Sequence, residues 1–132
     1  MAEAGYEVNY PHFRRYEAET VCLACFEFWK YGGAFSIEFG KQVGPFTDWA
    51  GRVVPPHELE VSHLAPPKRA FLRRPGNPRV FDEKAMFPYE AIAEDRLALE
   101  ALLSEVVSYL PQAEAWLRDG AVGANLFAFP DG

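Results

Sequence analysis

One long apolar run followed by a glycine pair constrains this chain more than any other feature. The run extends from Thr20 to Lys30 and is rich in residues that favour β-strands. The pair Gly32-Gly33 follows it, and glycine adopts positive φ angles without steric cost. Phe35, Ile37 and Phe39 then alternate with small or polar residues. The pattern predicts a hairpin over residues 20–40, whose first arm is covered on both faces and whose second arm has one buried and one wet face.

Length and composition predict one folded domain. A chain of 132 residues is long enough for one sizeable core and too short for two ordinary ones. A hydrophobic content of 49% and an aromatic content of 15% argue against disorder. The net charge of −6 argues against nucleic acid as a partner. The charge is uneven, because residues 51–87 carry seven lysines and arginines against four acids, whereas residues 88–132 carry two against eight.

The sequence also favours a cytoplasmic protein of bacterial type. Its first residues lack the basic start and the apolar stretch of a signal peptide. No apolar run approaches the roughly 20 residues that a membrane span needs, so we expect no membrane partner.

Two further segments are expected to add short strands to the hairpin. Residues 4–16 predict one or two short strands, interrupted at Pro11. Residues 43–87 hold seven of the eleven prolines, which limits regular structure there to loops and short edge strands. Residues 59–64 and 69–74 are the predicted edge strands, and Pro75 to Pro78 is a predicted tight loop.

Residues 88–120 predict helices. Pro88 suits a first helical turn, and apolar residues then recur at helical spacing, namely Ile92, Leu99, Leu103, Val106 and Leu110. We expect this long helix to end at Pro111 and a short second helix to follow, closed by Gly120, before a docked tail over residues 121–132. The predicted fold class is α+β: a single domain over residues 1–132, in which both helices pack on one face of an antiparallel sheet of three to five strands.

The order of these segments resembles a family of small bacterial α+β domains of unknown function. The resemblance rests on Gly5-Tyr6, Arg14-Arg15, the strand over 20–30, the strand from Phe35 to Gly40 and the acidic helix from Ile92 to Leu110. These motifs are structural, so the resemblance implies no catalytic residue. Members often have an amphipathic helix before the first strand. Here that helix is either absent, in which case a second subunit covers part of the sheet, or encoded upstream of Met1.

The residues that most often carry chemistry form no recognised motif. Cys22 and Cys25 have redox or zinc spacing, but residues three apart in a strand point to opposite faces, so we expect two buried structural thiols. His12, His57 and His63 match no metal-ligand spacing. The chain contains no phosphate-binding glycine motif and no serine in a nucleophile elbow. The sequence therefore predicts no catalytic residue, no metal site and no cofactor, and it favours a protein that is not an enzyme.

The candidate binding residues are arginines and one tryptophan. Arginine forms paired hydrogen bonds to carboxylates and phosphates, and a large aromatic residue in a loop either docks or is presented to a partner. The predicted ligand- or partner-binding residues are Arg14, Arg15, Arg69, Arg73, Arg74 and Trp49. The alternative for the arginines is a solvated rim that pairs with nearby acids.

Three functions remain open on this reasoning. The favoured one is a non-enzymatic domain of immunity or regulatory type that recognises an acidic protein or a small anion, because single domains without catalytic motifs commonly act in this way. The second is a small-molecule-binding or hydrolytic protein with a cleft over the sheet, where Arg14, Arg73 and Glu38 supply the polar groups. The third is a homodimer that buries an open sheet face.

Overall fold

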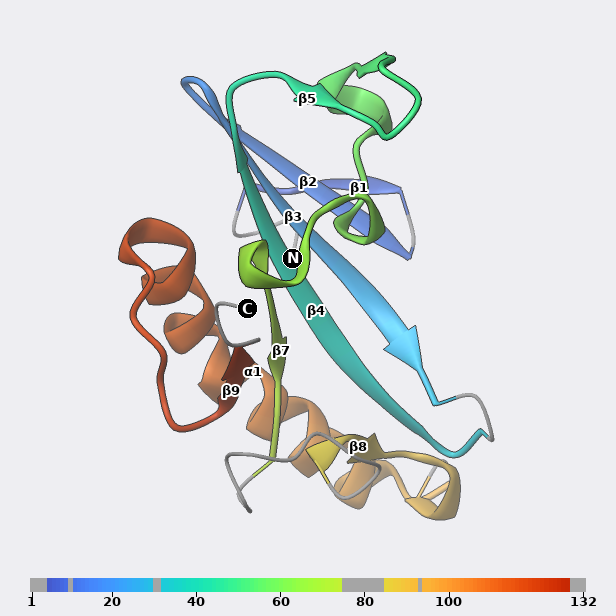
Figure 1. Cartoon of the computed structure of the whole chain (residues 1–132). Helices are drawn as coiled ribbons and strands as arrows, with labels where there is room; N and C mark the ends of the chain where they lie inside the picture. Colours follow the sequence, from blue (N-terminus) through green and yellow to red (C-terminus); the bar gives the residue numbers. More distant parts are fainter. Residues whose placement is uncertain (1–4, 10, 30–31, 75–84, 93, 129–132) are drawn as a thin grey trace.

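An antiparallel sheet and one long helix form the fold (Figure 1). The computed structural model describes residues 5–9, 11–29, 32–74, 85–92 and 94–128. The strand order is β1-β2-β3-β4-β7-β9, and β8 pairs with β4 beside this path. The strands are β1 (Glu7–Asn9), β2 (His12–Glu17), β3 (Thr20–Phe28), β4 (Ala34–Val43), β7 (Arg69–Leu72), β8 (Phe87–Pro88) and β9 (Leu126–Ala128), and the helix is α1 (Arg96–Asp119). The predicted α+β class is confirmed, but the described residues form seven strands in this sheet and one α-helix.

The central hairpin is longer than predicted, and its second arm is more deeply buried. β3 and β4 pair from Thr20 opposite Val43 to Phe28 opposite Phe35. Both faces of β3 are covered because its alternate side chains belong to two different cores, one on each side of the sheet. The prediction of a wet face on β4 is wrong, since Ser36 is 0% and Glu38 is 3% exposed. A second layer of chain covers that face.

This second layer consists of residues 46–68, which we call the loop layer. It contains a small two-stranded sheet, β5 (Phe46–Thr47) with β6 (Val53–Val54), and three 3-10 turns, η2 (Pro56–Glu58), η3 (Val61–His63) and η4 (Pro66–Lys68). Its apolar residues Val54, Leu59, Val61 and Leu64 pack against Val21, Leu23 and Cys25 of β3. The predicted edge strand over 59–64 is absent, because Val61–His63 form the turn η3, in which the His63 Nδ1 accepts a hydrogen bond from the Glu60 N–H at 2.9 Å.

The helix α1 covers the opposite face of the sheet. Figure 1 shows α1 (orange) and the 3-10 turns (green) on different sides of the strands. The residues of α1 that are buried are Leu102, Val106, Ala113, Trp116 and Leu117, and they join Phe13, Ile37 and Phe39 in one core. Leu103, predicted in the buried stripe, is instead 50% exposed. The sheet is therefore the middle layer of three.

The bounds of α1 differ from the prediction at both ends. The helix begins at Arg96, where the Asp95 carboxylate accepts a hydrogen bond from the Ala98 N–H, whereas Pro88 belongs to β8. Pro111 does not end the helix. Pro111 is exposed, and it has no N–H to donate to the carbonyl of Val107, four residues earlier. Val107 is 61% exposed, so water can donate a hydrogen bond to that carbonyl instead. Gly120 closes the helix with a φ of 78°, as expected of a C-cap.

The region after the loop layer returns to the sheet. β7 was predicted as an edge strand, but it lies between β4 and β9, because residues 126–128 of the tail pair with it. The predicted loop from Pro75 to Pro78 falls outside the described residues. Within the described part of the chain, no helix has the length and apolar character needed to cross a membrane.

Candidate functional site

The structure places the five predicted arginines in separate surroundings. Arg14 and Arg69 lie in one cross-strand row, on the face that the loop layer covers. Arg15 points to the other face and contacts α1. Arg74 also binds α1, while Arg73 is 2% exposed beside β9. These arginines therefore do not come together in one exposed patch.

Two of the arginines attach the loop layer to the sheet. The Arg14 Nε donates to the Leu59 carbonyl at 2.8 Å. The Arg69 Nε lies 2.7 Å from a Glu38 carboxylate oxygen, and its Nη1 donates to the Leu64 carbonyl at 3.4 Å. Because both Leu59 and Leu64 belong to the loop layer, these contacts are internal supports of the fold.

Glu38 is the most strongly perturbed acid on this face. It lies opposite Cys25 and Phe71 on the neighbouring strands and is almost completely buried. Burial raises the pKa of Glu38 from its ordinary 4.5 to about 7, with Arg69 acting in the opposite direction and the carboxylate of Glu27 adding to the rise. A carboxyl group that changes charge near neutral pH is thus built into the interior of the protein.

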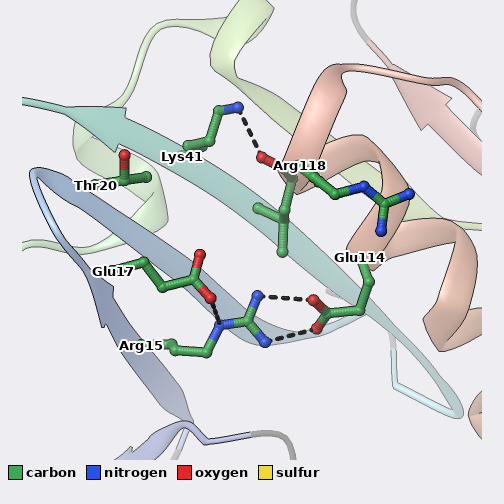
Figure 2. Close-up of a pocket in the computed structure, with 7 residues that line it drawn as sticks. Arg15, Glu17, Thr20, Lys41, Glu114 and Arg118 are labelled. Carbon is green, nitrogen blue, oxygen red and sulfur yellow. Dashed lines mark hydrogen bonds and ion pairs between the residues drawn. The ribbon is translucent and has the colours of Figure 1, made fainter.

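Arg15 lies at the centre of an ion-pair cluster between the sheet and α1 (Figure 2). Its Nη1 and Nη2 donate to the two carboxylate oxygens of Glu114 at 2.8 and 2.7 Å. Its Nε lies 3.1 Å from a Glu17 oxygen, and its guanidinium sits 4.7 Å from the ring centre of Tyr6. The hydrogen bonds to Glu114 raise the pKa of Arg15, so its charge is fixed. The three nitrogens and one face of this guanidinium are therefore engaged within the chain.

A charged pocket of about 290 Å³ opens beside this cluster. It is lined by Arg15, Glu17, Thr20, Lys41, Glu114, Leu117 and Arg118. In Figure 2 the Lys41 ammonium reaches the last turns of α1, where it donates to the Leu117 carbonyl at 2.7 Å. That carbonyl is one of those that a helix leaves unpaired at its C-terminus. Lys41 of β4 is therefore a second link between the sheet and the end of α1, beside the link that Arg15 of β2 makes.

An apolar pocket of about 470 Å³ adjoins the charged pocket. Its apolar lining residues are Tyr6, Phe39, Val107, Leu110, Pro111 and Ala113. It shares Glu114 and Arg118 with the charged pocket, so the two pockets meet along the same side of α1.

The Glu114–Arg15 pair predicts a measurable loss of stability on substitution. We expect Glu114→Gln to lower the free energy of unfolding by about 1–2 kcal/mol, because the paired hydrogen bonds from Arg15 to a carboxylate become one hydrogen bond to an uncharged amide oxygen. The 39% exposure of the Glu114 side chain limits the loss. Urea unfolding measures this change. Glu100→Gln is the matched control, since the Arg96–Glu100 pair is exposed on the same helix and should change stability by less than about 0.5 kcal/mol. Equal effects of the two substitutions would contradict this description of Arg15.

Trp49, the sixth predicted binding residue, is presented by a fixed turn between β5 and β6. The Asp48 Oδ1 accepts hydrogen bonds from the backbone N–H groups of Ala50 at 3.0 Å and Arg52 at 2.9 Å. Gly51 has a φ of 83°, which a residue with a side chain would adopt only with strain. Trp49 itself is 99% exposed. The turn is ordered by its own hydrogen bonds while the indole contacts solvent.

A second apolar pocket, which we call the hairpin pocket, opens next to this turn. Its volume is about 520 Å³. It is lined by Tyr16, Ala18, Glu19, Thr20, Val21, Gly44, Pro45, Phe46, Val53, Val54, Pro56 and Leu59. Ten large hydrophobic side chains are exposed in the described residues, and two of them, Tyr16 and Val53, line this pocket. Phe46 and Val53 belong to the two strands that carry the Trp49 turn, so the pocket lies at the base of that turn.

The cysteines and histidines form no further site among the residues described. Cys22 and Cys25 are free and buried on opposite faces of β3, as predicted. Burial raises the pKa of Cys25 to about 12, so its thiol stays protonated and unreactive at neutral pH. His12 lies 3.3 Å from Glu60. In the described ranges no three His, Cys, Asp or Glu side chains are arranged to hold a metal ion.

Sequence reasoning missed Lys41, Glu114 and Arg118 as pocket residues. The i, i+4 spacing of Glu114 and Arg118 on one helix face was an available signal. The place of Lys41 depends on the register of the sheet, which brings it level with Arg15 across β3. Comparisons of the chain with protein-family models, curated proteins and solved structures find no match, so the resemblance to small bacterial domains stays a prediction.

Proposed function

We propose that this chain is a non-enzymatic binding domain that recognises an acidic protein through Trp49 and the hairpin pocket. The observation that carries the proposal is the 99% exposure of Trp49 on a turn that Asp48 holds in place. Leaving a whole indole in water forfeits the gain that its burial gives. Tryptophan is also the residue type most enriched among the side chains that dominate binding energy at protein interfaces.

The arrangement of the turn supports tight recognition. Because the backbone around Trp49 is already ordered, the turn loses little conformational entropy when a partner binds. The hairpin pocket beside it offers space for an apolar side chain of the partner, and exposed Val53 and Tyr16 extend the contact area. An aromatic anchor next to a pocket is a common arrangement at the centre of an interface.

Charge favours an acidic partner. Residues 51–74 contain five lysines and arginines against two acids. Arg69 and Arg74 are paired with acids of the sheet and the helix, so Arg52 is the cation of this range that lies beside the Trp49 turn. Arg52 follows the Trp49 turn and makes only an exposed ion pair with Glu58, at 3.3 Å, which water screens. Complementary charge around an apolar anchor steers association and selects the partner.

A comparison of two surface variants tests this proposal. Tagged wild-type protein, Trp49→Ala and Leu97→Ala are each incubated with lysate of the native host, and the retained proteins are quantified by mass spectrometry. Leu97 is the matched control because it is 78% exposed on α1, away from the hairpin. We expect wild type and Leu97→Ala to retain one protein in stoichiometric amount. The affinity of that protein for Trp49→Ala should be about 30-fold lower or more, as expected when a residue that dominates the binding energy is removed.

The same variants separate this proposal from its alternatives. If Trp49→Ala retains the same protein as wild type with equal affinity, recognition does not depend on the indole and the proposal fails. Sedimentation of the purified proteins measures their oligomeric state and so tests the homodimer hypothesis. A wild-type dimer that becomes a monomer on Trp49→Ala substitution would assign the surface to a second copy of this chain instead of an acidic protein.

A further inference from the structure

The outer face of α1 carries apolar residues that are exposed to solvent. Val107 is 61% and Leu103 is 50% exposed, and Pro111 is exposed one turn further along the helix. The apolar pocket of about 470 Å³ opens at the edge of this face, since Val107, Leu110 and Pro111 line it. Apolar area of this kind on a helix is typical of a surface that packs against another helix.

The outer face follows a seven-residue repeat. Positions alternately four and three residues apart stay on one side of a helix and form the seam of a two-helix coiled coil. None of the positions of this seam belongs to the buried set of α1, and all but Glu114 are exposed. The seam positions are Glu100, Ser104, Val107, Pro111, Glu114 and Arg118.

The two ends of this seam carry opposite charges. Glu100 and Arg118 are separated by about five helical turns, so their side chains leave the helix in the same direction. The side chain of Glu100 is 57% exposed and lies 3.1 Å from Arg96, while that of Arg118 is 72% exposed and lies 3.6 Å from Asp119. Water screens both of these surface pairs, so either charge can take a new partner at small cost.

These charges select one orientation for two copies of the helix. In a parallel pair, Glu100 would face Glu100 of the second copy, and Arg118 would face Arg118. An antiparallel pair centred on Val107 would bring Glu100 against Glu114, again two like charges. When the centre lies between Val107 and Pro111, Glu100 faces Arg118 of the second copy at both ends of the seam.

We propose that α1 docks antiparallel on α1 of a second copy of this chain, with a twofold axis between Val107 and Pro111. These two residues form the apolar centre of the interface, and reciprocal Glu100–Arg118 pairs flank it. In the same register Ser104 faces Glu114, whose carboxylate can accept from its hydroxyl. The carbonyl of Val107, which Pro111 leaves without an N–H partner, keeps a hydrogen bond to water at this interface.

The length of the seam predicts a weak dimer. From Glu100 to Arg118 it extends about 27 Å at about 1.5 Å per residue, so the buried area is at the small end of specific interfaces. We expect a Kd on the order of 100 µM. Urea unfolding at a few micromolar protein therefore reports on the monomer.

Sedimentation equilibrium of the purified chain tests this dimer. Wild type should be monomeric at about 5 µM and largely dimeric at about 500 µM. Val107→Asp places a charge at the apolar centre and should weaken association at least about tenfold. Val53→Asp is the matched control, because Val53 is 60% exposed on β6 of the loop layer, and it should leave the Kd unchanged.

A pair of charge reversals tests the orientation and the register. Glu100→Arg and Arg118→Glu should each weaken self-association about tenfold or more, because like charges then face each other at both ends of the seam. An equimolar mixture of the two variants should regain the wild-type Kd. In the mixed dimer the introduced arginine faces the introduced glutamate, and the unchanged Arg118 faces the unchanged Glu100. An effect on folding alone would not be reversed by mixing.

Several results would overturn this interface. They are a wild-type chain that is still monomeric at about 500 µM, a dimer that Val107→Asp leaves intact, or a mixture of the charge-reversed variants that stays monomeric. If Val107→Asp instead loses a protein that the monomeric wild type captures from lysate, the face belongs to a different partner. Trp49→Ala should dimerise as wild type does, so failure of this interface and failure of the Trp49 proposal can be told apart.

Discussion

Replacement of Phe39 by alanine should lower the free energy of unfolding by about 3–5 kcal/mol. Phe39 is 1% exposed in the middle of β4, and its cross-strand neighbours on the helix face are Ala24 and Ala70. Because both neighbours are small, the phenyl ring fills space between the sheet and α1 that their side chains leave open. Neither alanine can reach into the cavity that its removal leaves, so the loss should lie toward the upper end of that range.

Urea unfolding monitored by circular dichroism measures this loss. Domains of this size are commonly stable by about 5–15 kcal/mol, so Phe39→Ala should retain a folded baseline at low temperature while its midpoint falls steeply. Val43→Ala is the control on the same strand. Val43 is 62% exposed, and its truncation should cost less than about 0.5 kcal/mol. A loss below about 1 kcal/mol for Phe39→Ala would show that α1 does not pack on this row.

Arg69→Met should also lower the free energy of unfolding strongly, and the size of this loss should depend on pH. The substitution keeps the aliphatic stem and removes the guanidinium that lies 2.7 Å from Glu38. Glu38 is then a buried acid without its cation, and breaking a buried ion pair from one side commonly costs about 3–5 kcal/mol. We expect a loss of about 3 kcal/mol at pH 8 and a much smaller one at pH 5.

The sign of the pH dependence follows from the raised pKa of Glu38. In the folded wild type this pKa is about 7, above its ordinary value of 4.5, because burial favours the neutral form. The folded state therefore binds the proton more tightly than the unfolded chain, and stability falls as pH rises from about 4.5 to 7. Without Arg69 the pKa of Glu38 rises further. The stability of the variant therefore continues to fall at higher pH, and its difference in stability from wild type grows.

The charged and titratable groups around Glu38 are Arg69, Glu27 and Cys25, and two variants isolate the ion pair. The double variant Glu38→Gln/Arg69→Met removes both charges and should recover much of the stability lost at pH 8. Arg52→Met removes an exposed pair and should have little effect at either pH. A deficit for Arg69→Met that is the same at pH 5 and pH 8 would mean that Glu38 does not carry its charge in the folded protein.

The central hairpin could be predicted from sequence because its signals are local. The apolar run from Thr20, the glycine pair and the alternation around Ile37 specify two paired strands without reference to the rest of the chain. The burial of Ser36 and Glu38 could not be predicted in this way. It depends on where residues 46–68 fold, and a proline-rich segment carries no periodic pattern that assigns it to a face.

The ends of α1 likewise include one that a local signal predicts and one that depends on the tertiary structure. Gly120 was recognised as the C-cap because a helix end has a local chemical signal. Pro88 and Pro111 misled the prediction, since proline suits a helix start and usually stops a helix. In the fold Pro88 pairs with Ala34 in β8, and Pro111 occupies an exposed position where the lost hydrogen bond costs little. Tertiary position decided both cases.

The candidate sites were predictable only in part. Trp49 could be proposed from the loop in which it lies, but its exposure follows from the turn that Asp48 closes. Arg14, Arg69 and Arg74 appeared as ligand groups in the sequence, while the fold uses each of them in an internal contact with Leu59, Glu38 or Glu105.

The state of the Trp49 indole, free and bound, is the most direct test of the account. Protein labelled with 5-fluorotryptophan gives separate ¹⁹F resonances for its three tryptophans, and Trp49→Phe assigns one of them. We expect the Trp49 resonance to shift between H₂O and D₂O in the isolated protein, because its indole is exposed to solvent. On addition of the captured partner, that solvent shift should disappear. A Trp49 resonance insensitive to solvent in the isolated protein, or unchanged in the complex, would contradict the proposed recognition surface.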